Sequence, residues 1–202
     1  MSPVTHWLAS WVVAAHTTRN PRDVRLVTLV GVLPDADGLG LFVDLGHRLL
    51  GGSPTDWYAR YHHFGFHGLP AALILAGIAT VLARERWRVP LAALAVFHLH
   101  LLCDLVGSRG PSDVDLWPIF YSGPVSKEWM WLWKQQWALD AWPNRLISVS
   151  LLVWSLVLAI RVGHSPVILF NRRADAAVMM VLQKWRLQLG GRWRDTRTES
   201  IS

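Results

Sequence analysis

Inside its apolar segment 89–106, this chain carries the stretch Phe97-His98-Leu99-His100-Leu101-Leu102-Cys103-Asp104-Leu105. Residues four positions apart lie on the same face of a helix, so a helix here places the His100 imidazole beside the Asp104 carboxylate. Burying both polar groups among leucines is costly unless each has a partner, and a divalent metal satisfies both at once. A core histidine that is hydrogen-bonded to a neighbouring aspartate is the alternative. The segment therefore predicts a long buried helix that carries a metal-binding pair or an internal hydrogen bond.

The composition favours a membrane protein. Of the 202 residues, 52% are hydrophobic and 17% charged, and 13 are tryptophan. This is apolar-rich and charge-poor for a soluble globule, and tryptophan is enriched where a membrane meets water. The mean hydropathy of +0.26 is modest for a fully embedded protein. We therefore expect a membrane-embedded domain over residues 1–165 and a polar tail over residues 166–202.

Three apolar segments are about long enough to cross a bilayer, allowing for tilt. They comprise residues 66–83, 89–106 and 146–160. Residues 1–16 read as an apolar helix that is too short to span. The fold class predicted is all-α, with about three to four transmembrane or re-entrant helices.

The tail is predicted to form a basic amphipathic helix on the membrane surface. Apolar residues recur there at helical spacing, at Val178, Val181, Leu182, Trp185 and Leu189. Their basic neighbours suit anionic lipid headgroups. The formal net charge of +6 also invites a nucleic-acid partner. Because the basic residues adjoin apolar segments, we expect lipid and no nucleic acid.

The positive-inside rule brings the polar residues to one membrane face. Basic residues join the first two apolar segments at 84–88 and follow the third at 161–173, so both places should be cytoplasmic. His62 and His67 then lie on the opposite face with His100 and Asp104. A further set of basic residues fits only if part of segment 7–33 crosses as well: Arg19, Arg22, Arg25, Arg48 and Arg60.

Four short motifs occur in an order that resembles a known family. They are Thr5-His6, then Gly31-x-Leu33-Pro34-Asp35-x-Asp37, then His62-x-x-x-x-His67, then His100-x-x-x-Asp104, with Gly107 and Pro118 following. Over roughly residues 1–125 the chain resembles the YdjM-like family of inner-membrane metal-dependent hydrolases. That family is distantly similar to zinc-dependent phospholipase C and to single-strand-specific zinc nucleases, which are mostly helical and use His/Asp metal clusters.

The resemblance implies a set of metal ligands: His6, Asp35, Asp37, His62, His67, His100 and Asp104. It also shows a departure, because the family's His-Arg-x-x-Thr-His-Ser is replaced here by residues 62–68, which lack the arginine and both hydroxyls. Imidazole and carboxylate ligands without thiolate suit zinc, manganese or iron, and the resemblance places zinc first. The single cysteine, Cys103, rules out an internal disulfide and a cysteine-based zinc cluster.

Seven ligands are enough for two metals about 3.5–4 Å apart that act together on a phosphoester. His63 or His98 is then available to protonate the leaving group, although His98, two residues from His100, faces away from it on a straight helix. Because the Trp-rich segment 107–144 should cover the site at headgroup level, a phospholipid or another amphiphilic phosphoester is the expected substrate. Two alternatives remain open: a membrane interaction or regulatory protein with a structural metal, and a transporter or proton relay, since intramembrane His and Asp residues also mark such pathways.

Overall fold

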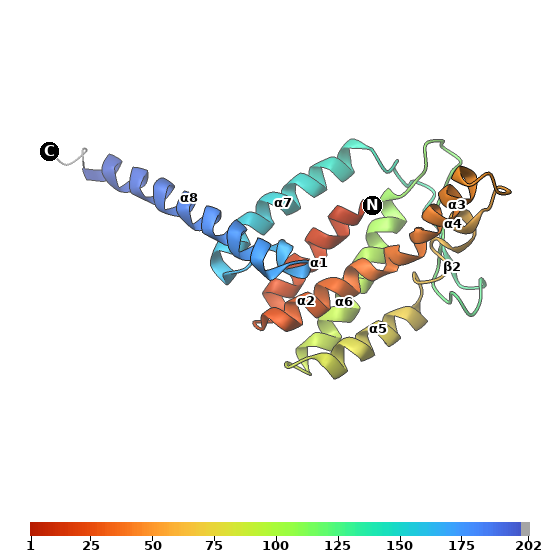
Figure 1. Cartoon of the computed structure of the whole chain (residues 1–202), viewed down its shortest axis with the longest axis horizontal. Helices are drawn as coiled ribbons and strands as arrows, with labels where there is room; N and C mark the ends of the chain where they lie inside the picture. Colours follow the sequence, from red (N-terminus) through yellow and green to blue (C-terminus); the bar gives the residue numbers. More distant parts are fainter. Residues whose placement is uncertain (199–202) are drawn as a thin grey trace.

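The computed structural model describes residues 1–198, with side chains described to residue 188. The prediction of an all-α fold is confirmed. The bundle consists of α1 (Pro3–Thr17), α2 (Pro21–Val32), α5 (Leu69–Leu82), α6 (Arg88–Gly107) and α7 (Trp142–Val162), while α8 (Arg172–Thr198) projects away from it (Figure 1). The core between the helices combines a few large side chains, such as Trp11 and Phe97, with many alanines. Small residues let helices approach closely, as in membrane bundles.

Helices α1 and α2 form a tight antiparallel pair. Each has a polar N-cap followed by proline: the Ser2 hydroxyl accepts a hydrogen bond from the Thr5 N–H, and the Asn20 side chain accepts one from the Arg22 N–H. Gly31 lets the two helices approach closely, because a Cβ there would lie 2.0 Å from Ser10 Oγ. The sequence left open whether part of segment 7–33 crosses the membrane, and this helix pair provides that crossing.

The predicted number of candidate spans is confirmed, and one of them lies in a segment, Pro21–Leu49, that was not predicted as a span. The helices long and apolar enough to cross a membrane are Pro21–Leu49, α6 and α7, whereas α5 is shorter than a span. Helix α2 ends at Val32, two residues before Pro34. A 3-10 helix with Pro34 in its first turn, η1 (Leu33–Leu39), then leads directly into α3 (Gly40–Leu49). Proline is tolerated there because N–H groups of a first turn lack partners in any case.

Two basic turns lie at the same end of the bundle. The buried Asp23 carboxylate accepts hydrogen bonds from the backbone N–H groups of Arg84 and Glu85, at 2.7–3.2 Å. The Glu85 carboxylate in turn accepts from the N–H groups of Arg19 and Asn20. The α1–α2 turn therefore joins the α5–α6 turn, which accounts for Arg19, Arg22 and Arg25.

Replacing Asp23 with alanine is expected to lower the free energy of unfolding by about 3 kcal/mol, because two backbone N–H groups lose a charged acceptor. Unfolding of the detergent-solubilised protein, followed by circular dichroism, measures the change. Asp56→Ala is the matched control: it removes a carboxylate that is 67% exposed and pairs with Arg60, so a loss below about 1 kcal/mol is expected. Equal losses in the two variants would contradict the role given to Asp23.

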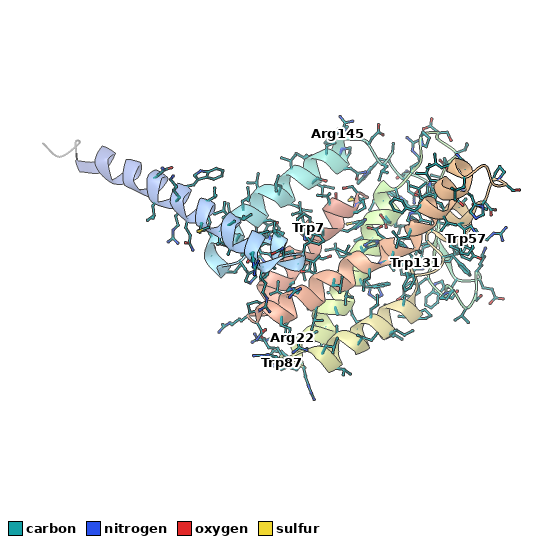
Figure 2. All side chains as sticks on the ribbon, viewed as in Figure 1. Trp7, Arg22, Trp57, Trp87, Trp131 and Arg145 are labelled. Atoms are coloured by element: carbon teal, nitrogen blue, oxygen red, sulfur yellow. The ribbon has the colours of Figure 1, made fainter. Side chains whose placement is uncertain are left out.

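The connection between α6 and α7 folds over the other end of the bundle. It contains a short antiparallel hairpin of β1 (Ile119–Phe120) and β2 (Met130–Trp131). Tyr121 stacks on Trp131, with ring centroids 4.3 Å apart. Figure 2 shows Trp57 and Trp131 at this end of the bundle, and Arg22 and Trp87 at the opposite end. A short helix α4 (Trp57–Tyr61) lies beside α3.

The tail is helical, as predicted, but its apolar face is divided. After η2 (Pro166–Leu169), the first turns of α8 bury Met179 and Leu182, while Val181 and Trp185 remain exposed. Leu189 lies outside the described side chains. Part of this face therefore packs on the bundle, and the remainder is free to contact lipid.

Candidate metal centre

The candidate site lies where four separate parts of the chain meet. Helix α1 supplies His6, and α6 supplies His100 and Asp104 one turn apart. The 3-10 helix η1 supplies Asp35 and Asp37, and the segment between α4 and α5 supplies His62, His63 and His67. The predicted ligands are thus brought together from distant parts of the sequence.

One potential metal-binding group comprises His6, Asp35, His100 and Asp104. One ligand atom from each lies within 4.8 Å of the others. His6 Nε2 lies 3.1 Å from Asp104 Oδ1, and His100 Nε2 lies 3.0 Å from Asp104 Oδ2. The His6 and His100 rings stack with centroids 3.7 Å apart. Two imidazoles and two carboxylates are a ligand set that suits a zinc-like cation.

A second group comprises His63, His67 and Asp104. Asp104 Oδ2 lies 3.4 Å from His67 Nε2 and 3.9 Å from His63 Nε2. Asp104 is therefore common to both groups. A carboxylate in this position can bridge two metals.

Hydrogen bonds at the far side of two rings fix which nitrogen carries a proton. His100 Nδ1 donates to the Gly31 carbonyl at 2.8 Å, and His67 Nδ1 donates to Asp37 at 2.9 Å. Each neutral ring then presents an unprotonated Nε2, and these two nitrogens face each other at 3.2 Å. Two facing lone pairs need a cation or an additional proton between them.

Asp37 and His62 lie one layer outside these groups. Asp37 accepts from His62 Nδ1 at 2.8 Å through one oxygen, and from His67 Nδ1 and the Phe66 N–H through the other. Metal-binding histidines commonly donate their second ring N–H to a carboxylate, which orients the ring. The structure thus shows Asp37 and His62 in contact with the ligand groups, but not within either.

The donor set fits a metal in a second respect. Four buried atoms of the cluster have no hydrogen-bond partner: His6 Nδ1, Asp35 Oδ2, His63 Nδ1 and Asp104 Oδ2. Buried polar atoms normally have partners, so an unpartnered carboxylate oxygen among imidazoles indicates a site for a cation. Asp104 Oδ1, in contrast, accepts from the Ser108 hydroxyl and contacts the Met1 amino group.

The charges of the site also favour the binding of a cation. Burial alone would lower the pKa of His67, but hydrogen bonds and charge from Asp104 and Asp37 outweigh it and raise that pKa to about 9. A pocket that attracts a proton to this ring attracts a metal cation for the same electrostatic reason.

His63 has an unusual backbone. Its φ of 66° lies in the left-handed region, which costs a non-glycine residue about 1–3 kcal/mol and is typical of functional sites. Burial and the neighbouring charge of His67 hold the pKa of His63 well below its ordinary value. The strained turn directs a neutral imidazole toward Asp104.

A cavity of about 810 Å³ opens onto the cluster. Asp35, His62, His63 and Asp104 line its polar side. Trp117 packs edge-on against the rings of His62 and His63, with centroids 5.3 Å from each, so the α6–α7 connection covers the site. Apolar side chains complete the wall, among them Leu39, Phe42 and Leu139.

Sequence reasoning missed two residues at this cavity, Ser108 and Arg109. They directly follow α6, four and five residues beyond Asp104. Their position at the end of the ligand-bearing helix was the available signal.

These features define a class of protein: a multi-pass α-helical membrane protein with a buried His/Asp cluster at one end of its bundle. The family model described as YdjM inner membrane protein matches residues 1–180, and the chain belongs to this family. It is accordingly an inner-membrane protein. No curated protein and no solved structure matches the chain.

Proposed function

We propose that this protein is a metal-dependent hydrolase of phosphoesters with a dinuclear site. The observation that carries the proposal is the sharing of Asp104 by two His/Asp groups beside a cavity. When bound there, divalent metals activate water and stabilise negative charge that develops on a phosphoester. Zinc is the metal proposed first, with manganese and iron as alternatives.

The residues of the chain have distinct roles in this proposal. One metal would be held by His6, Asp35, His100 and Asp104, and the other by Asp104 and His67, while His63, the third member of the second group, is kept for proton transfer. Asp37 orients His67, and His62 hydrogen-bonds Asp37 from the cavity side. His62 and Asp37 were expected from the sequence to bind the metal directly, whereas in this proposal they orient the ligands through hydrogen bonds.

His63 is proposed to transfer protons during hydrolysis. Unlike His6, His67 and His100, it lines the cavity, while its Nε2 still lies 3.9 Å from Asp104. A proton-transferring group needs to reach both the reacting water or leaving group and the cluster. The position of His63 meets both needs.

The substrate class is proposed to be an amphiphilic phosphoester, such as a membrane phospholipid. His100 and Asp104 lie 12 and 16 residues after Arg88, which places the cluster about 18–24 Å along α6 from the basic end. With that end cytoplasmic, the cavity opens near the headgroups of the opposite leaflet. The basic tail is proposed to contact anionic headgroups of the cytoplasmic leaflet.

Hydrolysis of a chromogenic phosphodiester by the purified, zinc-loaded protein tests the proposal. We expect turnover that is lost with a chelator, restored by zinc and abolished by His63→Ala at unchanged metal content. Turnover that is insensitive to chelator, or absent from protein shown to hold zinc, would refute it.

A structural metal in a regulatory membrane protein is the second candidate. The observation in its favour is that residues 62–68 lack the arginine and hydroxyls of the family motif. Full metal content without any turnover is the result that would favour it.

A further inference from the structure

Arg109 is the feature that neither the family motif nor the proposed mechanism uses. It follows α6 directly and lines the same cavity as Asp35, His63 and Asp104. Within the described part of the chain, it is the only lysine or arginine that lines this cavity. The cavity therefore has one permanent side-chain cation close to the cluster.

The backbone of Arg109 is held firmly. Its N–H donates to the Trp137 carbonyl at 3.2 Å, and its carbonyl accepts from the Leu139 N–H at 2.9 Å. The buried Asn144 side chain ties the same region together by donating to the carbonyls of Gly107 and Leu139 at 2.9 Å each. Because hydrogen bonds hold both the N–H and the carbonyl of Arg109, its backbone fixes the direction in which the side chain leaves the chain.

Only part of the Arg109 guanidinium has a hydrogen-bond or ion-pair partner. Nη1 pairs with Asp113, whose side chain is 95% exposed, whereas Nε is buried and has no partner. An ion pair with so exposed a carboxylate contributes about 0–1 kcal/mol, so it only weakly stabilises the position of the half-buried Arg109 side chain. The free Nε edge of a guanidinium, together with an Nη, matches two oxygens of a phosphate group.

We propose that Arg109 binds the phosphate group of the substrate. This inference rests on the proposed function, which it deepens by supplying the positive charge that residues 62–68 lack. The apolar side chains of Leu39 and Phe42, which are 58% and 67% exposed, line the same cavity and suit the hydrophobic part of an amphiphile. Arg109 is thus a specificity-determining residue that the chain supplies from a different element.

Direct binding of inorganic phosphate to the zinc-loaded protein, measured by calorimetry, tests this inference without requiring turnover. Arg109→Gln is expected to weaken binding by about tenfold or more, as for the loss of a charge-assisted hydrogen bond, and Arg109→Lys to restore part of it. Arg145→Gln is the matched control, because Arg145 is exposed at the start of α7, does not line the cavity and carries the same charge (Figure 2). It should change the affinity less than twofold.

A second arm separates free phosphate from a lipid headgroup. The same variants are compared for binding of phosphatidylglycerol from nanodiscs. A loss in both arms supports a phosphate subsite that accepts lipid, and a loss with inorganic phosphate alone supports a soluble phosphoester. Wild-type affinity of Arg109→Gln in both arms, at unchanged zinc content and thermal stability, would overturn the inference. Phosphate binding that depends on Arg109 without any turnover would instead refute only the proposed hydrolysis.

Discussion

Replacing Asp104 with asparagine is expected to reduce bound metal from about two equivalents per chain to near zero. Asp104 is the only residue common to both potential metal groups. Its carboxylate lies 3.0–3.9 Å from ring nitrogens of four histidines, His6, His63, His67 and His100. Asparagine keeps the shape of the side chain but removes the charge that offsets a cation. Elemental analysis of the purified variant after zinc loading measures the result.

Asp115→Asn is the matched control for this experiment. Asp115 lines the same cavity but belongs to neither group, so its variant should retain the wild-type metal content. Retention of metal by Asp104→Asn, or equal loss in both variants, would contradict the assignment of Asp104 as the shared ligand.

Replacing Asp37 with asparagine is expected to weaken zinc affinity by about 10–100-fold while leaving the number of sites unchanged at saturating zinc. The reason is that Asp37 contacts one candidate ligand, His67, and does so through a hydrogen bond. Its other hydrogen bonds, from His62 and the Phe66 N–H, fix the position of its own carboxylate. Loss of its charge loosens the orientation of the His67 ring without removing a ligand.

Competition with a chromogenic zinc chelator provides the affinities for wild type, Asp37→Asn and Asp115→Asn. An unchanged zinc affinity of Asp37→Asn would contradict the orienting role of Asp37. Loss of one equivalent that excess zinc does not restore would show that Asp37 binds the metal itself, as the sequence analysis first assigned.

Local spacing predicted much of the site. The interval between His100 and Asp104 indicated one helix face, and α6 places their side chains in contact at 3.0 Å. The positive-inside rule also brought His67 to the same end as this pair, because charge at segment ends constrains which ends meet. Both arguments rely on information that lies within single segments.

The remaining features depend on tertiary contacts that no single segment encodes. The division into two groups that share Asp104 follows from the way that α1, η1 and the segment 62–68 bring their side chains to α6, which spacing alone does not specify. The continuation of the chain from α2 through η1 into α3 was not predicted; it is possible because the missing N–H of Pro34 falls in the first turn of a 3-10 helix, where it costs little. Arg109 was missed because the α6–α7 connection fixes its backbone through Trp137 and Leu139, some 30 residues further along the chain.

The turn between α1 and α2 accounts for three of the five basic residues that the positive-inside rule left unexplained. Arg19, Arg22 and Arg25 lie at this turn with the other basic residues, whereas Arg48 in α3 and Arg60 in α4 lie at the end of the bundle that carries the cluster. Hydrogen bonds that the carboxylates of Asp23 and Glu85 accept from backbone N–H groups join the two turns at one end. The basic turns and the cluster therefore lie at opposite ends of the bundle.

The metal content of the wild-type protein tests the central claim most directly. The protein is purified in detergent without chelator, incubated with excess zinc, desalted and subjected to elemental analysis. We expect about two equivalents of zinc per chain, since two His/Asp groups share Asp104. Absence of bound zinc, and of manganese or iron after the same treatment, would contradict the account and leave a cluster that serves packing or proton movement.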